Sequence, residues 1–108
     1  MAGRKVIWTE TAAKQRRLIL EYWLQRNQSP TYPLKLLELS NEKAEIIAGN
    51  PLIYKTSEFP NMRVAAMGHF SLFYKTNDDN VIITAFWDNR QDPKNLLELL
   101  KALKPNTN

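Results

Sequence analysis

The sequence of 108 residues contains no cysteine, one histidine and three glycines, and it lacks a long hydrophobic run. Without cysteine there is neither a disulfide framework nor a zinc ribbon. The single histidine, His69, leaves no histidine-rich metal site and no triad with several candidate bases. A membrane span needs about 20 apolar residues, and the N-terminal residues lack the apolar segment of a signal peptide. These absences predict a cytoplasmic protein with no metal, no cofactor and no membrane partner.

The composition that remains is average for a globular protein, with 44% apolar and 24% charged residues. It excludes a disordered tail protein, a collagen-like chain and a coiled coil. A chain of this length buries about 65% of its unfolded surface, which is enough for one hydrophobic core. We therefore expect a single domain over residues 1–108, with an ordered core over residues 5–104.

The net charge of +4 is concentrated at the N-terminal end. Residues 1–17 contain five basic residues and one acidic residue, whereas the rest of the chain contains ten of each. A basic end suits an anionic partner, either a nucleic acid or an acidic protein segment. A solvated basic surface that keeps a small protein soluble explains the charge equally well. Arg16 falls within the apolar arc of a predicted helix, where we expect its stem to lie on the core and its charge to reach solvent.

The N-terminal half of the sequence predicts one strand and two helices. Lys5–Trp8 is a short run of β-branched and aromatic residues. Thr9 is a suitable N-cap for a helix that continues to about residue 27. A second helix is expected over residues 31–48, with Thr31 as its cap. Gly49 should end this helix in a left-handed conformation, because glycine adopts it without steric cost.

The C-terminal half predicts three strands and a last helix. The strands are expected over residues 62–67, 69–76 and 81–87, with turns at Gly68 and at residues 77–80. The last strand is apolar on both faces, which places it centrally in the sheet. A final helix is expected over residues 94–104. The order β-α-α-β-β-β-α predicts an α+β domain of two layers, with two antiparallel helices on one face of a mostly antiparallel sheet.

Four segments carry a resemblance to a known group of proteins, namely Val6–Ala12, Asn50–Pro51, Phe70–Tyr74 and Phe86–Pro93. They resemble, in turn, an opening strand that leads into a helix with an early alanine, a proline after the second helix, an aromatic-rich third strand and the end of the fourth strand. Together they cover roughly residues 5–100. They resemble the RelE/ParE superfamily of bacterial type II toxin–antitoxin toxins, which includes plasmid-stabilisation proteins.

The resemblance implies the fold predicted above and a toxin that inhibits growth by acting on translation, through mRNA binding, or on DNA gyrase. It implies a cognate antitoxin as partner, with operator DNA contacted only through that antitoxin. If the toxin is an enzyme, the resemblance implies a metal-independent endoribonuclease. The alternatives are a ribosome-dependent endoribonuclease proper and a degenerate toxin-fold protein that only binds its antitoxin or operator DNA.

Three residues are the candidate catalytic residues under this resemblance. Arg90 lies near a basic position that follows the fourth strand, and Arg63 lies near another on the second strand. We expect Arg63 on the sheet face that the helices leave open, and His69 is the one imidazole available as a proton donor. Ser71 stands where many family members have arginine, and neither tyrosine nor histidine follows Arg90. The last two features argue against RNA cleavage.

Each candidate also has a structural interpretation. Arg90 has acidic residues two positions away on either side, Asp88 and Asp92, and it either binds phosphate or pairs with one of them. His69 follows a turn glycine and is either a proton donor or an ordinary surface residue. Trp87 either stacks on a base or belongs to an apolar strand of the core.

Overall fold

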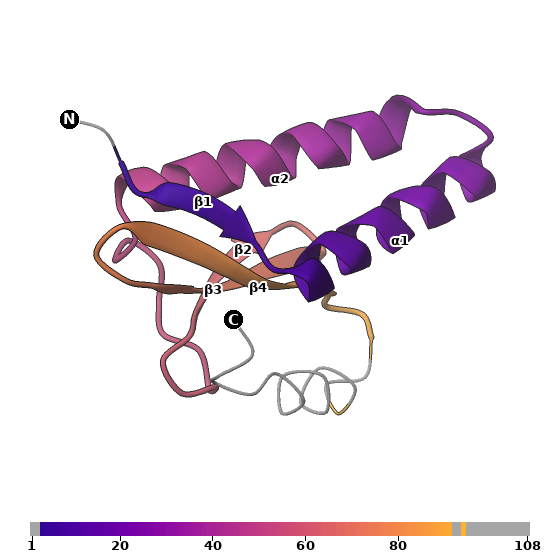
Figure 1. Cartoon of the computed structure of the whole chain (residues 1–108). Coiled ribbons are helices and arrows are strands. Elements are labelled where there is room, and N and C mark those ends of the chain that lie inside the picture. Colours follow the sequence, from indigo (N-terminus) through magenta and orange to yellow (C-terminus); the bar gives the residue numbers. More distant parts are fainter. Residues whose placement is uncertain (1–2, 92–93, 95–108) are drawn as a thin grey trace.

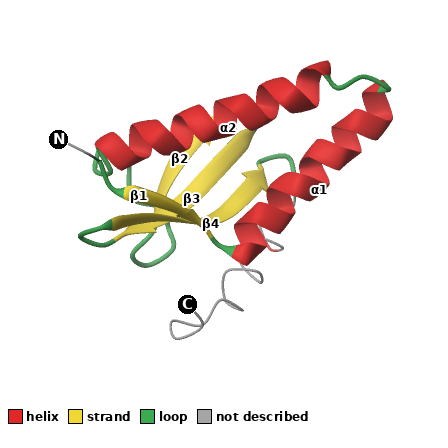
Figure 2. Ribbon diagram, turned by 45° about the horizontal axis from the view of Figure 1, so that its top comes forward, coloured by secondary structure: helices red, strands yellow, loops and turns green. Residues whose placement is uncertain are grey.

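The computed structural model describes residues 3–91 and residue 94. Its elements are β1 (Lys5–Trp8), α1 (Glu10–Asn27), α2 (Thr31–Gly49), β2 (Arg63–Met67), β3 (Phe70–Thr76) and β4 (Asn80–Asp88). The two antiparallel helices cover one face of the four-stranded sheet (Figure 1, Figure 2). The predicted α+β class and the element order up to the fourth strand are confirmed. The predicted last helix, residues 94–104, lies outside the described residues except for residue 94.

The strands follow one another across the sheet in the order β1-β4-β3-β2. β1 pairs with β4 in parallel, and the other neighbours pair antiparallel. β4 therefore lies inside the sheet, as its two apolar faces predicted. Its register against β3 shifts between Phe73 and Tyr74, so that Thr84 is the extra residue of a bulge. The Thr84 hydroxyl donates to the carbonyl oxygen of Phe73 at 3.1 Å, which gives this buried group a partner.

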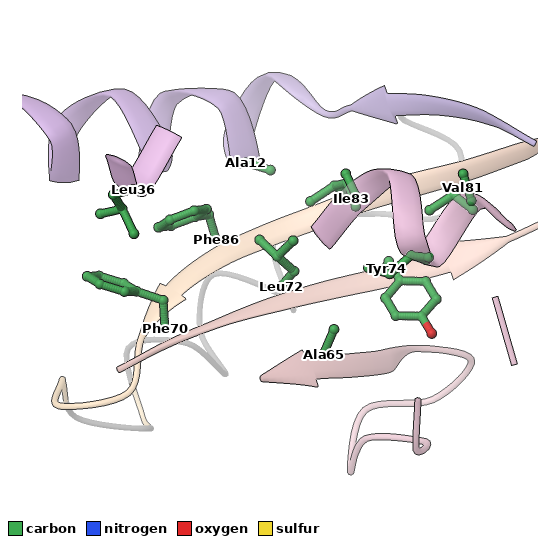
Figure 3. Close-up of a cluster of buried hydrophobic side chains, with 12 residues drawn as sticks. Ala12, Leu36, Ala65, Phe70, Leu72, Tyr74, Val81, Ile83 and Phe86 are labelled. Carbon is green, nitrogen blue, oxygen red and sulfur yellow. The ribbon is translucent and has the colours of Figure 1, made fainter. Parts of the chain in front are cut away.

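The main hydrophobic core fills the space between the helices and the sheet. Figure 3 labels nine of its members, which come from both helices and from β2, β3 and β4. The buried members are Ala12, Leu36, Ala44, Ile47, Ala48, Ala65, Phe70, Leu72, Tyr74, Val81, Ile83 and Phe86. A smaller cluster of Phe73, Ala85 and Trp87 packs with Phe59, Met62 and Val64. Because successive strand residues point to opposite faces, this second cluster lies on the other side of the sheet.

Tyr74 ties the sheet to the loop that follows α2. Its side chain is fully buried, and its hydroxyl donates to the carbonyl oxygen of Pro51 at 2.7 Å. Burial raises the pKa of Tyr74, because the charged phenolate loses its hydration inside the core. The hydrogen bond therefore joins a neutral phenol to the loop at every pH near neutrality.

The starts of the two helices differ in their capping. The predicted Thr9 cap of α1 is confirmed, because its side chain accepts a hydrogen bond from the backbone N–H of Ala12 at 3.1 Å. The predicted Thr31 cap of α2 is wrong by one residue. Pro30 takes the N-cap position without a side-chain hydrogen bond, and the Ser29 hydroxyl accepts from the N–H of Thr31 at 3.3 Å. Pro30 has helical dihedral angles, so the N-cap position falls at Pro30 and Thr31 is already the first residue of the helix.

The end of α2 also differs from the prediction. Gly49 is the last residue of the helix and does not adopt the expected left-handed conformation. Asn50 ends the helix with φ −153° instead. The residue before a proline is pushed towards extended dihedral angles, and Pro51 follows directly. The predicted turn at Gly68, by contrast, has φ +64° and joins β2 to β3. Of the two helices within residues 3–91, neither is long and apolar enough to cross a membrane.

Candidate functional site

The three candidate catalytic residues lie at two different ends of the sheet. His69 is in the turn between β2 and β3, and Arg90 lies just beyond β4. Both are at the same end, because Asp88 at the end of β4 pairs with Phe70 at the start of β3. Arg63 is the first residue of β2, four residues from the end of that strand, or about 13 Å along it. The structure therefore brings His69 and Arg90 together and keeps Arg63 apart.

The expected position of Arg63 on the open face of the sheet is wrong. In β2 it alternates with Ala65 and Met67, which pack against the core beneath the helices. Its neighbour Val64 faces the other way, into the smaller cluster. The sequence defined the alternation, but it could not say which of the two faces the helices cover. The Nη1 atom of Arg63 donates to the backbone carbonyl oxygen of Tyr54 at 2.7 Å, which fixes the side chain against the loop.

Arg63 also lines a surface hollow of about 600 Å³ between the loop before β2 and the ends of β2 and β3. The charged residues in its lining are Arg63, Lys75 and Glu58. Its one phenol belongs to Tyr74, whose hydroxyl is already bound to Pro51 and whose pKa is raised by burial. The lining can attract a small anionic group, but it offers no side chain suited to proton transfer near neutral pH.

Arg90 forms a two-pronged ion pair with Asp88. Its Nε and Nη2 atoms each lie 2.9 Å from a different carboxylate oxygen, and its backbone N–H bonds to the same carboxylate. These hydrogen bonds lower the pKa of Asp88 and raise that of Arg90. The guanidinium group also lies 5.7 Å from the ring of Trp23 and 5.8 Å from that of Phe70. Asp92, the other acidic neighbour, is outside the described residues.

His69 is exposed in its turn, and its backbone carbonyl accepts a hydrogen bond from the N–H of Asn89 at 2.8 Å. Its ring is close enough to Asp88 to contribute to the lowered pKa of that carboxyl. Ser71, at the position where the family often has arginine, donates to the side-chain oxygen of Asn89 at 2.9 Å. The groups around His69 thus fix the turn and the exit of β4, with the Asp88 carboxylate already bound by Arg90.

A polar junction that the sequence analysis missed joins β1, α1 and α2 through Arg16. The guanidinium carbon lies 3.9 Å from the ring centre of Trp8, and Nη1 donates to Ser40 Oγ at 2.9 Å and to Asn41 Oδ1 at 2.8 Å. Burial lowers the pKa of Arg16. Arg16 is partly buried, as expected for a stem that lies on the core, and its charge is in addition held by two acceptors on α2 that the sequence did not indicate. The signal was present as a polar residue, Ser40, on the apolar face of the second helix.

Gln15, the neighbour of Arg16, attaches α1 to the sheet. Its side-chain oxygen accepts a hydrogen bond from the backbone N–H of Phe86 at 2.9 Å. β1 pairs with β4 only as far as Ile83, so this part of β4 has no neighbouring strand on that edge among the described residues. The Gln15 amide therefore takes the place of a strand partner for a buried backbone group.

A hairpin of two helices on this mixed sheet is the architecture of RelE/ParE-type toxins. The family model for the ParE toxin of the type II toxin–antitoxin system parDE matches residues 6–93. The chain therefore belongs to the ParE toxin family and is a type II toxin component. Among curated proteins, no sequence matches it significantly.

A solved structure titled "Chromosomal ParDE TA system from P. aeruginosa" has the same fold. It is 20% identical in sequence, with a TM-score of 0.67. The similarity covers 77% of this chain and 92% of that chain. At this identity the match bears on the fold, and it agrees with the two-layer architecture described above.

Proposed function

We propose that this toxin inhibits bacterial growth by binding and poisoning DNA gyrase without chemistry of its own, and that a cognate antitoxin neutralises it. The observation that carries the proposal is the separation of the candidate catalytic residues. Arg63 is bound to a backbone carbonyl at one end of β2, whereas His69 and Arg90 lie at the other end. A binding function needs no such residues in one place.

RNA cleavage makes stricter demands on geometry. The ribose hydroxyl must be activated, the charge on phosphorus stabilised and the leaving oxygen protonated, all within hydrogen-bond reach of one phosphate. His69 with Arg90 is the pair that comes nearest to this arrangement. The donors of Arg90 that would meet a phosphate are, however, engaged by Asp88. An endoribonuclease built on His69 and Arg90 is therefore the second candidate function.

The test compares the two targets with the same purified protein. We expect gyrase supercoiling to be inhibited while reporter mRNA on translating ribosomes stays intact. The His69→Ala variant should inhibit gyrase as the wild type does, because His69 is an exposed turn residue. Cleavage of the mRNA by wild-type protein, with loss of cleavage in His69→Ala, would overturn the proposal in favour of the endoribonuclease.

A growth assay tests the toxin and its partner together. Induced expression of the chain alone should slow bacterial growth, and co-expression of an acidic protein encoded next to it should restore growth. Normal growth at confirmed full-length expression would contradict both candidate functions. It would leave a toxin-fold protein that only binds.

A further inference from the structure

The outward side of α1 presents two large apolar side chains to solvent. Leu18 and Tyr22 are 50% and 55% exposed, and they lie four residues apart, which makes them neighbours on the helix surface. Leu18 follows Arg16 by two residues, or about 200° around the helix axis. Because Arg16 contacts α2, Leu18 points away from the helix hairpin. α1 itself lies at one margin of the helix layer, which leaves this side accessible (Figure 2).

This side of α1 has the pattern that one helix presents to another. Lys14, Leu18, Glu21 and Gln25 follow one another at spacings of four, three and four residues, which places them in a single row along the helix. We call the surface formed by this row and Tyr22 the α1 face. A surface hollow of about 970 Å³ lies along it, lined by Leu18, Glu21, Tyr22, Leu24, Gln25 and Arg26. The α1 face therefore has room for a second helix laid against it.

The charges on and beside the α1 face balance one another. They comprise two basic and two acidic side chains, namely Lys14, Arg17, Glu10 and Glu21. Within residues 3–91, none of these four side chains forms an ion pair. Arg26, at the margin of the face, lies over the ring of Trp23 at 6.0 Å. An acidic partner would meet two carboxylates here and a basic partner would meet two cations, whereas a second copy of this chain brings both signs.

We infer that the α1 face is the surface through which two copies of this chain pair, with their α1 helices antiparallel and a two-fold axis near Leu18. In this arrangement Leu18 packs against Leu18 of the other copy, and one Tyr22 ring flanks this central pair on either side. A two-fold interface is self-complementary, so every contact in it occurs twice.

The order of the charges along α1 suits this arrangement. In an antiparallel pair centred on Leu18, a residue three positions after the centre meets a residue three or four positions before it. Glu21 therefore lies beside Lys14 of the other copy, and Arg17 is within one helical turn of the same carboxylate. A parallel pair would instead place each of these charges beside its own copy, which costs free energy.

The size of the α1 face sets the strength of the pairing. One helix against one helix covers less than the roughly 800 Å² per partner of a standard stable interface. The ion pairs at its margin are exposed and add little. We therefore expect a reversible dimer with a dissociation constant of about 10–100 µM. The inference does not rest on the proposed function, since pairing through α1 is measured on the purified chain without any target.

Sedimentation velocity of the full-length protein from about 5 µM to about 500 µM tests the inference. We expect the mass to rise from that of a monomer towards that of a dimer. Leu18→Ser combined with Tyr22→Ser should weaken the dimer about tenfold or more, since it removes the central apolar anchors. Leu39→Ser combined with Ile46→Ser removes similarly exposed side chains from α2 and should leave the dimer unchanged. A monomer at every concentration, or a dimer that only the α2 variant abolishes, would overturn the inference.

Charge reversal distinguishes pairing of two copies from any other use of this surface. One variant combines Lys14→Glu with Arg17→Glu, and the other carries Glu21→Lys. Each variant alone should be monomeric, because like charges then meet across the two-fold axis. An equimolar mixture should form a heterodimer at least as tight as the wild-type dimer, because each reversed charge meets an opposite one. Circular dichroism confirms beforehand that both variants keep the wild-type helix content, which these exposed positions allow. Wild-type dimerisation of either variant alone, or a mixture that stays monomeric, would contradict the antiparallel pairing.

Discussion

Arg16 and Arg90 both lie over tryptophan rings, but their surroundings are opposite. Arg16 is partly buried, lacks a carboxylate among its hydrogen-bond acceptors and has its pKa lowered by burial. Arg90 is 47% exposed at its side chain, is paired with Asp88 and has its pKa raised. Arg16 connects β1, α1 and α2, with acceptors on α2 that lie 24 and 25 residues away, whereas the ion pair of Arg90 spans two residues.

The difference shows that an arginine's contribution to stability depends more on its position in the fold than on whether it forms an ion pair. An exposed ion pair contributes little, because water screens both charges whether or not they meet. A partly buried guanidinium has already lost part of its hydration. Hydrogen bonds to neutral acceptors replace the lost bonds to water, so removing them leaves the charge unsatisfied. We therefore expect Arg16 to stabilise the whole fold and Arg90 to set only the local path of the chain after β4.

The largest effect should come from removing Arg16. We expect Arg16→Ala to lower the free energy of unfolding by about 2–4 kcal/mol, because it removes two charge-assisted hydrogen bonds and a partly desolvated cation–π contact. Urea denaturation measures the change. Arg17→Ala is the matched control, since Arg17 is exposed, and it should cost less than about 0.5 kcal/mol. Equal effects of both variants would show that Arg16 stabilises the fold no more than an exposed arginine does.

A smaller effect isolates one contact of the Arg16 junction. Ser40 is fully buried and accepts from Arg16 at 2.9 Å, while Asn41 on the exposed side continues to hold the same Nη1 atom. We expect Ser40→Ala to cost about 1–2 kcal/mol, because one of the two hydrogen bonds is lost. In the Arg16→Ala background the same substitution should cost less, and a double-mutant cycle measures the difference. Strict additivity would mean that the two side chains act independently.

Removing Arg90 should have less effect than either change. We expect Arg90→Ala to cost less than about 1 kcal/mol, the usual range for an exposed ion pair. The pKa of Asp88, measured by NMR titration, should rise towards its ordinary value, because its main hydrogen-bond donor is gone. A loss of stability as large as that of Arg16→Ala would show that Arg90 also holds α1, through Trp23, to the end of the sheet.

The smallest expected effect is a difference in how the stability losses of the two arginine variants depend on pH. Because the folded-state pKa of Asp88 is lowered, its stabilising contribution is present above the ordinary aspartate pKa of about 3.9 and is lost as pH falls through the folded-state value. The stability difference between wild type and Arg90→Ala should therefore shrink in acid. The difference for Arg16→Ala should stay constant between about pH 5 and pH 9, because its acceptors do not titrate. Urea denaturation at several pH values measures both.

The features that the sequence predicted are those with local causes. The Thr9 cap acts three residues away, the turn at Gly68 needs a positive φ, and the ion-pair alternative for Arg90 lay two residues away. The alternation of apolar residues located β2, β3 and β4 to within one residue at each end. Such features depend on residues nearby in the chain, so they can be predicted from the sequence.

The features that it missed have partners far away in the sequence. Arg16 finds its acceptors on α2 24 and 25 residues later, and Gln15 bonds to Phe86 across 71 residues. The face occupied by Arg63 depended on which side of the sheet the helices cover. The separation of Arg63 from His69 follows from the length of β2. The pairing of Phe70 with Asp88, by contrast, depends on strand register that only the folded sheet defines, and it brings Arg90 to the end of the sheet where His69 lies. The fold class was therefore predictable, whereas the arrangement of the candidate site was not.

The parallel pairing of β1 with β4 sets the timing of assembly during synthesis. Lys5 pairs with Asn80, 75 residues further along the chain. At about 5–20 residues per second, a ribosome needs about 4–15 s to make that stretch. During this interval the first strand has no strand to pair with, and contacts between such distant residues also slow folding itself. Each newly made toxin molecule therefore passes through a period in which its sheet is incomplete. The sheet can form in full only after β4 has left the ribosome and can pair with β1.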